Sequence, residues 1–152
     1  MGSKENSELF ELTAQHTENI LSLQGVNLAS PWSLDSIKNT LENEYNFSHG
    51  VMLNGELVSF CLSTLVIDEL NILHFVTHKD YRRLGLGKFL LFELIKKAKA
   101  RGCVSSFLEV RKSNFPAIAL YQSLGFSEVD IRVNYYQDPS EDASTMKLSL
   151  YE

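Results

Sequence analysis

The sequence predicts a mixed α/β domain built around one sheet, and three observations support this. About seven short segments are apolar or alternating, as strands are, and about four longer segments repeat their apolar residues with helical spacing. They follow the order strand, helix, helix, three strands, helix, strand, helix and two strands. An Asn54-Gly55 hairpin signal lies among the three central strands, so these are expected to pair antiparallel.

The N-terminal third is expected to hold one strand and two helices. Residues 9–12 form a short strand, and residues 13–25 form a short, irregular helix. Ser33 has the residue type of an N-cap, so a helix is expected to begin at Leu34 and to continue to about residue 45. Trp32, just before this cap, has two possible roles: a hydrophobic contact that fixes the start of the helix, or part of a pocket wall.

The central strands are expected at residues 51–53, 57–67 and 70–77, with a second turn at Asp68 and Glu69. A helix over residues 86–101 follows, and Gly102 is expected to end it as a C-cap.

The C-terminal third begins with an apolar strand over residues 104–110. Pro116 then lies where the first turn of a helix over residues 115–124 is expected, because the missing N–H of proline costs nothing there. Ser113 or Asn114 is expected to cap this helix. Two final strands are expected at residues 126–136 and 143–151, separated by a polar loop.

Composition limits the possible functions. The chain has 152 residues, which predicts one domain over residues 9–152 after a flexible, polar segment at residues 1–8. The net charge of −5 argues against a nucleic-acid binder and is compatible with a basic partner such as a cationic peptide. No stretch is apolar enough for a signal peptide or a membrane span, so the cytoplasm is the expected location.

The two cysteines, Cys61 and Cys103, both lie in strand-like contexts and are expected to be small core residues. Neither belongs to a CxxC motif or a Cys/His cluster, so no metal site is expected.

The segment between strand 70–77 and helix 86–101 contains two arginines and two glycines, Arg82, Arg83, Gly85 and Gly87. The first N–H groups of a helix lack partners within the helix and carry the positive end of its dipole, so such a corner can bind a phosphate. Glycines would let the phosphate approach the backbone without a Cβ in the way. The alternative is an ordinary strand-to-helix turn with solvated arginines.

Two further residues are candidates for acid–base chemistry. Glu109 is a carboxylate near the end of an apolar strand. A buried carboxylate is costly unless it forms an ion pair or serves in catalysis, and burial would raise its pKa towards that of a working base. The simplest partner is Arg111, two residues further along the same strand. Tyr121 lies on the apolar face of helix 115–124 and either fills the core or supplies its hydroxyl to a site. The four histidines are interpreted as structural, because no partner for a triad is evident.

These residues also carry a family resemblance. The segment from Arg82 to Gly87 resembles the Q/R-x-x-G-x-G/A signature of the GNAT superfamily of acetyl-CoA-dependent N-acetyltransferases. More specific segments resemble its RimI type, which acetylates the N-terminal alanine of a ribosomal protein. These are residues 30–33, 66–69, 108–114, 117–121 with 125–126, 132–136 and 141–143.

The resemblance implies a single GNAT-like domain with a mixed, mostly antiparallel sheet of about seven strands and about four flanking helices. It implies a general base at Glu109 and a general acid at Tyr121. The implied acetyl-CoA contacts are Phe75, Val76, Thr77, Arg82, Arg83, Leu84, Gly85, Leu86, Gly87, Lys88 and Asn114. The implied acceptor contacts are Trp32, Tyr135, Tyr136, Glu141 and Asp142. Among these, Glu141 and Asp142 are expected to pair with a basic peptide.

The implied activity is acetyl transfer from acetyl-CoA, without a metal, to the α-amine of a small-subunit ribosomal protein, through direct attack in a ternary complex. The implied partner is a basic N-terminal peptide, with no direct nucleic-acid or membrane contact, and the chain is expected to be a monomer. The alternatives are an acetyltransferase for a small amine and a non-catalytic acyl-CoA-binding module. His74, Phe115 and Pro116 depart from the relatives and bear on acceptor preference and cofactor affinity.

Overall fold

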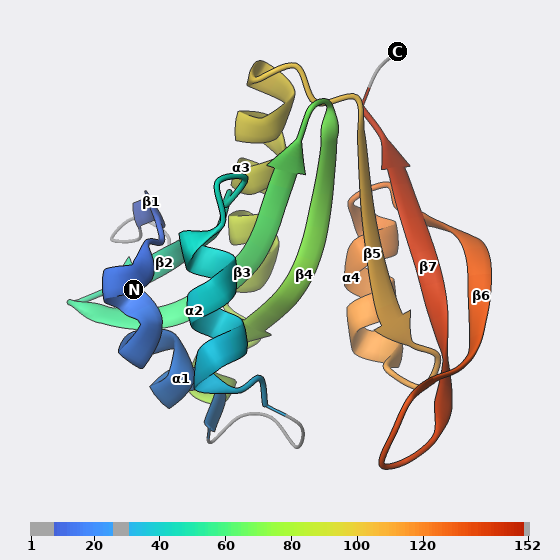
Figure 1. Cartoon of the computed structure of the whole chain (residues 1–152), viewed down its shortest axis with the longest axis horizontal. Helices are drawn as coiled ribbons and strands as arrows, with labels where there is room; N and C mark the ends of the chain where they lie inside the picture. Colours follow the sequence, from blue (N-terminus) through green and yellow to red (C-terminus); the bar gives the residue numbers. More distant parts are fainter. Residues whose placement is uncertain (1–7, 26–30, 151–152) are drawn as a thin grey trace.

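The computed structural model describes residues 8–25 and 31–150 and consists of one seven-stranded sheet with helices on both faces (Figure 1). The strands lie in the order β1-β2-β3-β4-β5-β7-β6. Their bounds are β1 Glu8–Glu11, β2 His49–Leu53, β3 Glu56–Val66, β4 Glu69–Thr77, β5 Ser105–Arg111, β6 Ser127–Tyr136 and β7 Glu141–Ser149. The helices are α1 Thr17–Gly25, α2 Leu34–Glu42, α3 Leu86–Ala100 and α4 Phe115–Ser123.

The predicted element order is confirmed, and so is the mostly antiparallel sheet. Several bounds differ from those predicted by one to a few residues, and β7, for example, begins at Glu141 and not at Ala143. Glu8, placed in the flexible segment, is the first residue of β1, whereas residues 1–7 lie outside the described part. Helix α2 ends at Glu42 because the Asn43 side chain accepts a hydrogen bond from the Tyr45 N–H and turns the chain. Cys103 is buried, but it lies in the connection before β5 and not in a strand.

Each face of the sheet has its own apolar core. Helices α1 and α2 pack Ile20 and Ile37 against Phe60 of β3 on one face. Helices α3 and α4 pack Leu90 and Tyr121, with their neighbours, on the other face. Among the described residues, no helix is both long enough and apolar enough to span a membrane.

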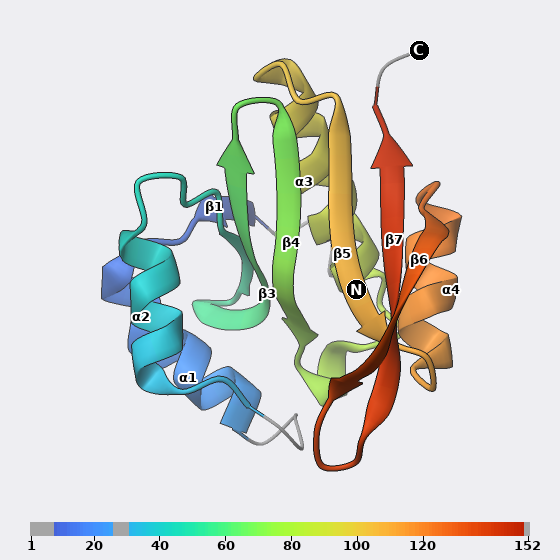
Figure 2. The same cartoon turned by 45° about the vertical axis from the view of Figure 1, so that its right-hand side comes forward.

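Strands β4 and β5 are the one parallel pair of the sheet, and they separate along their length. Their pairing covers only Glu69–Asn71 and Ser105–Phe107, although β4 continues to Thr77 and β5 to Arg111. Figures 1 and 2 show the two ribbons diverging from this short pairing towards the ends of both strands. The carboxyl ends of β4 and β5 are therefore not paired with each other in the middle of the sheet.

Local signals explain several turns and caps of the fold. Asn54 and Gly55 both have positive φ, 53° and 81°, as a tight hairpin turn requires. The Ser33 side chain accepts a hydrogen bond from the Ser36 N–H at the start of α2, and Asn114 accepts one from the Ala117 N–H at the start of α4. The predicted cap at Ser33 is therefore confirmed, and Asn114 is the cap of α4.

Candidate active site

A cavity of about 680 Å³ lies between the end of β4, the start of α3 and the start of α4. Every residue predicted to contact acetyl-CoA lines it, except Leu84, which is exposed outside it. Pro116, which was expected to bear on cofactor affinity, also lines it, as do Tyr81, Ala117 and Leu120, which were not predicted. We call this space the donor cavity.

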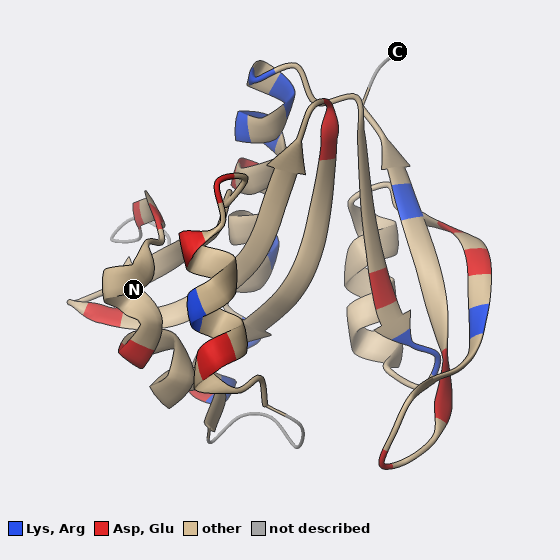
Figure 3. Cartoon of the chain, in the orientation of Figure 1, with Lys and Arg blue, Asp and Glu red and all other residues tan. Residues whose placement is uncertain are grey.

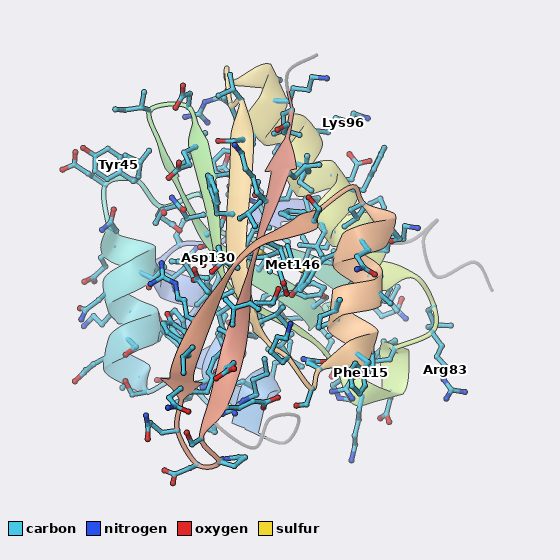
Figure 4. The ribbon with its side chains drawn as sticks, turned by 90° about the vertical axis from the view of Figure 1, so that its right-hand side faces the viewer. Tyr45, Arg83, Lys96, Phe115, Asp130 and Met146 are labelled. Carbon is cyan, nitrogen blue, oxygen red and sulfur yellow. The ribbon has the colours of Figure 1, made fainter. Side chains whose placement is uncertain are left out.

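The first turn of α3 supplies the polar end of the donor cavity. Gly85 is the N-cap and has a left-handed φ of 77°, and no side chain caps the helix there. Because a glycine cap cannot accept the first amide hydrogens, they remain available to an anion. Arg82, Arg83 and Lys88 are exposed around this turn, and Figure 4 shows the Arg83 side chain directed away from the body of the protein.

The structure gives a reason for glycine at position 87 that differs from the predicted one, which was close approach of a phosphate to the backbone. A Cβ at this position would lie 2.9 Å from both Phe75 Cζ and Thr77 Oγ1. Its small size is therefore needed so that the first turn of α3 can lie against the side chains at the end of β4. This contact holds the helix N-terminus beside the strand end.

A second cavity, of about 450 Å³, lies between the separated ends of β4 and β5. It is lined by Trp32 before α2, by β4 around His74, by β5 around Glu109, and by Tyr136 of β6. We call this space the acceptor cavity. Three residues, Phe75, Asn114 and Tyr121, line both cavities, so the two spaces meet at these side chains.

Glu109 lies in the acceptor cavity, and its side chain is 29% exposed. Its Oε2 accepts hydrogen bonds from Arg132 Nε at 3.2 Å and from Thr145 Oγ1 at 3.3 Å. The predicted partner, Arg111, is wrong: its guanidinium instead bonds Glu141 and the carbonyls of the β6–β7 turn. The reason is sheet order, since β7 and β6 lie beside β5 and present Thr145 and Arg132 to the carboxylate.

Tyr121 is 7% exposed and lies where the two cavities meet. Burial raises the pKa of its hydroxyl well above the ordinary value, and the nearby Cys61 and Tyr136 raise it further. The hydroxyl therefore stays protonated at neutral pH and is able to donate. Complete burial likewise raises the pKa of the Cys61 thiol, so this cysteine is not a thiolate nucleophile.

The remaining residues that were predicted to contact the acceptor instead contact other groups of the protein itself. Glu141 accepts hydrogen bonds from the Ser113 N–H and from Arg111, and these bonds lower the pKa of its carboxyl. Asp142 Oδ1 accepts a bond from the Asn134 N–H. Tyr135 contacts the Tyr136 ring but does not line the acceptor cavity.

Glu141 is thus engaged within the protein, and its pairing with a basic peptide stays a prediction. Figure 3 shows acidic and basic residues interspersed on β5, β6 and β7, and several of them form ion pairs with one another.

His74 is a further residue of the site that was not predicted to contact a substrate. It was interpreted as structural, yet it lines the acceptor cavity and stacks on Trp32. Only its departure from the relatives indicated a role in acceptor preference. In the described part of the chain, no group of His, Cys, Asp or Glu is arranged to hold a metal ion.

The chain is similar to known acetyltransferases. The family model of the acetyltransferase (GNAT) family matches residues 13–126. The ribosomal protein bS18-alanine N-acetyltransferase of Escherichia coli strain K12 is 42% identical over 125 residues, which are 80% of this chain and 83% of that protein.

Solved structures agree with this similarity. The crystal structure of the ribosomal-protein-S18-alanine N-acetyltransferase from Escherichia coli superimposes with a TM-score of 0.91 and 34% identity, over 96% of this chain and 95% of that one. The NatC complex bound to Gag peptide and CoA shares the fold, with a TM-score of 0.85 and 20% identity over 95% and 99% of the two chains. The sheet with its separated central strands, the family match and the E. coli relative together show that the chain belongs to the GNAT family of acetyltransferases.

Proposed function

We propose that this acetyltransferase moves the acetyl group of acetyl-CoA to the N-terminal α-amine of a protein, the N-terminal alanine of ribosomal protein bS18. The observation that carries this proposal is the meeting of the donor and acceptor cavities at Phe75, Asn114 and Tyr121. A thioester entering from one side can meet an amine entering from the other. The similarity to the E. coli enzyme supports the choice of acceptor.

The donor cavity fits acetyl-CoA in two ways. The uncapped start of α3, with Arg82, Arg83 and Lys88 around it, suits the pyrophosphate. Beyond Asn71, the described residues of β4 do not pair with β5, so main-chain groups on that edge can bond the pantetheine arm. We infer that a main-chain N–H on this edge, at the end of β4, stabilises the oxyanion of the tetrahedral intermediate.

The chemistry follows from the two candidate catalytic side chains. An α-ammonium has a pKa of about 8 and must lose a proton before it can attack. Glu109 takes this proton, directly or through one water, and the neutral amine forms the N–C bond. The C–S bond then breaks, and the protonated Tyr121 hydroxyl donates its proton to the departing thiolate. The attacking nitrogen loses its second proton to solvent as the amide forms, and solvent in turn restores the proton of Tyr121.

We infer direct attack in a ternary complex and not an acetyl-enzyme intermediate. The Cys61 thiol lies near enough to Tyr121 to affect its pKa, but complete burial keeps this thiol protonated and away from solvent. The donor and acceptor cavities are also both open, so both substrates can be bound together.

The test is acetylation of a peptide with the N-terminal sequence of bS18, followed by mass spectrometry. We expect one acetyl group on the α-amine, no reaction with the same peptide already blocked at its N-terminus, and much slower reaction with free amines. Faster turnover of an amino acid or polyamine would favour the small-amine alternative. Acetyl-CoA binding without CoA release against any amine would overturn the enzymatic proposal.

A further inference from the structure

The side chain of Gln24, at the end of α1, is wholly buried and joins two segments that are distant in sequence. Its Oε1 accepts a hydrogen bond from the Trp32 N–H at 3.1 Å, and its Nε2 donates to the Trp32 carbonyl. Because the main-chain N–H can only donate and the carbonyl can only accept, the orientation of the amide is determined. Gln24 thus clamps the backbone of Trp32 from both sides.

The same Gln24 Oε1 also contacts His74 Nε2 of β4 at 2.8 Å. An amide oxygen can only accept, so Nε2 of His74 carries the hydrogen. The His74 ring stacks on the Trp32 indole, with ring centroids 4.7 Å apart and planes at 1°, and its edge meets Phe60. One buried amide therefore orients both the indole and the imidazole beneath it.

This cluster forms one wall of the acceptor cavity. Trp32 and His74 both line that cavity together with Glu109, whereas Gln24 does not. An α-amine that reaches Glu109 brings the first side chain of the acceptor into the same space. The stacked pair then lies where that side chain must fit.

We propose that Gln24 and His74 are positioning residues that hold the Trp32 indole as a rigid wall, and that this wall restricts the acceptor to a small first side chain. The inference rests on the proposed acetylation of protein N-termini. Both residues act by holding the Trp32 indole in place and not by contact with the reacting atoms.

Two substitutions test the two parts of the proposal, the clamp by Gln24 and the support of the indole by His74. Gln24→Ala removes the clamp, so the KM for an Ala-starting peptide should rise about tenfold, while kcat and the KM for acetyl-CoA change little. His74→Ala opens space beneath the indole, so the ratio of kcat/KM for a Leu-starting peptide to that for the matched Ala-starting peptide should rise about tenfold or more. The control is Gln15→Ala, an exposed glutamine remote from the cavity, which should change neither value.

The molecule also contains a spectroscopic reporter, because Trp32 is its single tryptophan. Indole emission should move to longer wavelength in Gln24→Ala, as the ring leaves its stack and meets water. His74→Phe keeps a flat ring without the bond to Gln24, so it should retain the preference for a small first residue. Circular dichroism melting of each variant separates loss of the wall from loss of the fold.

Distinct results overturn the inference and the proposed function. If the wild-type protein acetylates no peptide, the proposed function fails and the inference fails with it. If the wild type acetylates the Ala-starting peptide but Gln24→Ala keeps its peptide KM and emission, the clamp is refuted. If a folded His74→Ala loses activity equally for every first residue, the selectivity role is refuted.

Discussion

The carboxylate of Glu109 and the guanidinium of Arg132 lie 3.2 Å apart, although strand β7 separates their strands in the sheet. Thr145 of that intervening strand donates to the same carboxylate oxygen. The proposed base is therefore oriented by two side chains from two other strands. A change that keeps these bonds but removes the basicity isolates its chemical role.

Glu109→Gln is such a change, because the amide oxygen still accepts from Arg132 and Thr145. We expect kcat/KM at neutral pH to fall about 100-fold or more, as the loss of a general base predicts. The Kd for acetyl-CoA and the melting temperature should stay near the wild-type values. Steady-state kinetics with calorimetry measure both, and wild-type turnover by the variant at pH 7 would remove the base assignment.

Tyr121→Phe tests the proposed acid, since it removes only the hydroxyl from a buried ring. We expect kcat to fall roughly 10- to 100-fold because the thiolate must leave without a proton. Acetyl-CoA affinity should remain nearly unchanged. A matched comparison is Tyr135→Phe, at a tyrosine outside the acceptor cavity, for which kcat should not change. An unchanged kcat in Tyr121→Phe would show that the proton comes from elsewhere.

Gly87→Ala tests the contact between α3 and the end of β4. The new Cβ would lie 2.9 Å from Phe75 and Thr77, so we expect about 1 to 3 kcal/mol of destabilisation and weaker acetyl-CoA binding. Gly25→Ala is the control, because among the described residues, apart from its chain neighbours and its own helix backbone, no atom lies within 4 Å of the Cβ it would add. Urea unfolding and titration calorimetry provide the two measurements. Equal effects of both substitutions would contradict the packing explanation.

The free energy of unfolding should decrease as the pH falls, because of the buried His74. Burial lowers the pKa of His74 to about 4, against 6.5 for the free side chain. Between these values the unfolded chain binds a proton that the folded chain does not, so the free energy of unfolding decreases as the pH falls from 6.5 towards 4. The full difference is roughly 2 to 3 kcal/mol, discounted because the ring is only partly buried.

Urea unfolding at pH 7.5, 6.5 and 5.5 measures this effect, at pH values above the range in which Glu128 and Glu141 titrate. His49, whose pKa burial also lowers, contributes in the same direction and remains in all variants. His74→Gln should have a shallower pH dependence than the wild type. Identical slopes for the two proteins would refute a depressed pKa at His74.

The turn between β3 and β4 contains a strained residue. Ile67 has a positive φ of 58° and is 89% exposed. A β-branched residue in this conformation costs about 1 to 2 kcal/mol, so Ile67→Gly should raise the free energy of unfolding by about 1 kcal/mol. Thermal and urea unfolding measure the gain, and a loss of stability would show that the side chain makes a necessary contact.

The sequence by itself determined the elements and their order. The Asn54-Gly55 turn, the Ser33 cap and the caps around α4 depend on residues within a few positions of one another, so local chemistry predicts them. The corner at Arg82–Gly87 is also local, which is why nearly all of its predicted residues line the donor cavity.

Only the tertiary structure decided which side chains meet. The partner of Glu109 depends on sheet order and register, and these placed Arg132 and not Arg111 at its carboxylate. Gln24 and His74 are 50 residues apart, and their contact needs α1 and β4 to be packed together. A residue type shows what a side chain can bind, whereas the folding of distant segments selects the partner that it meets.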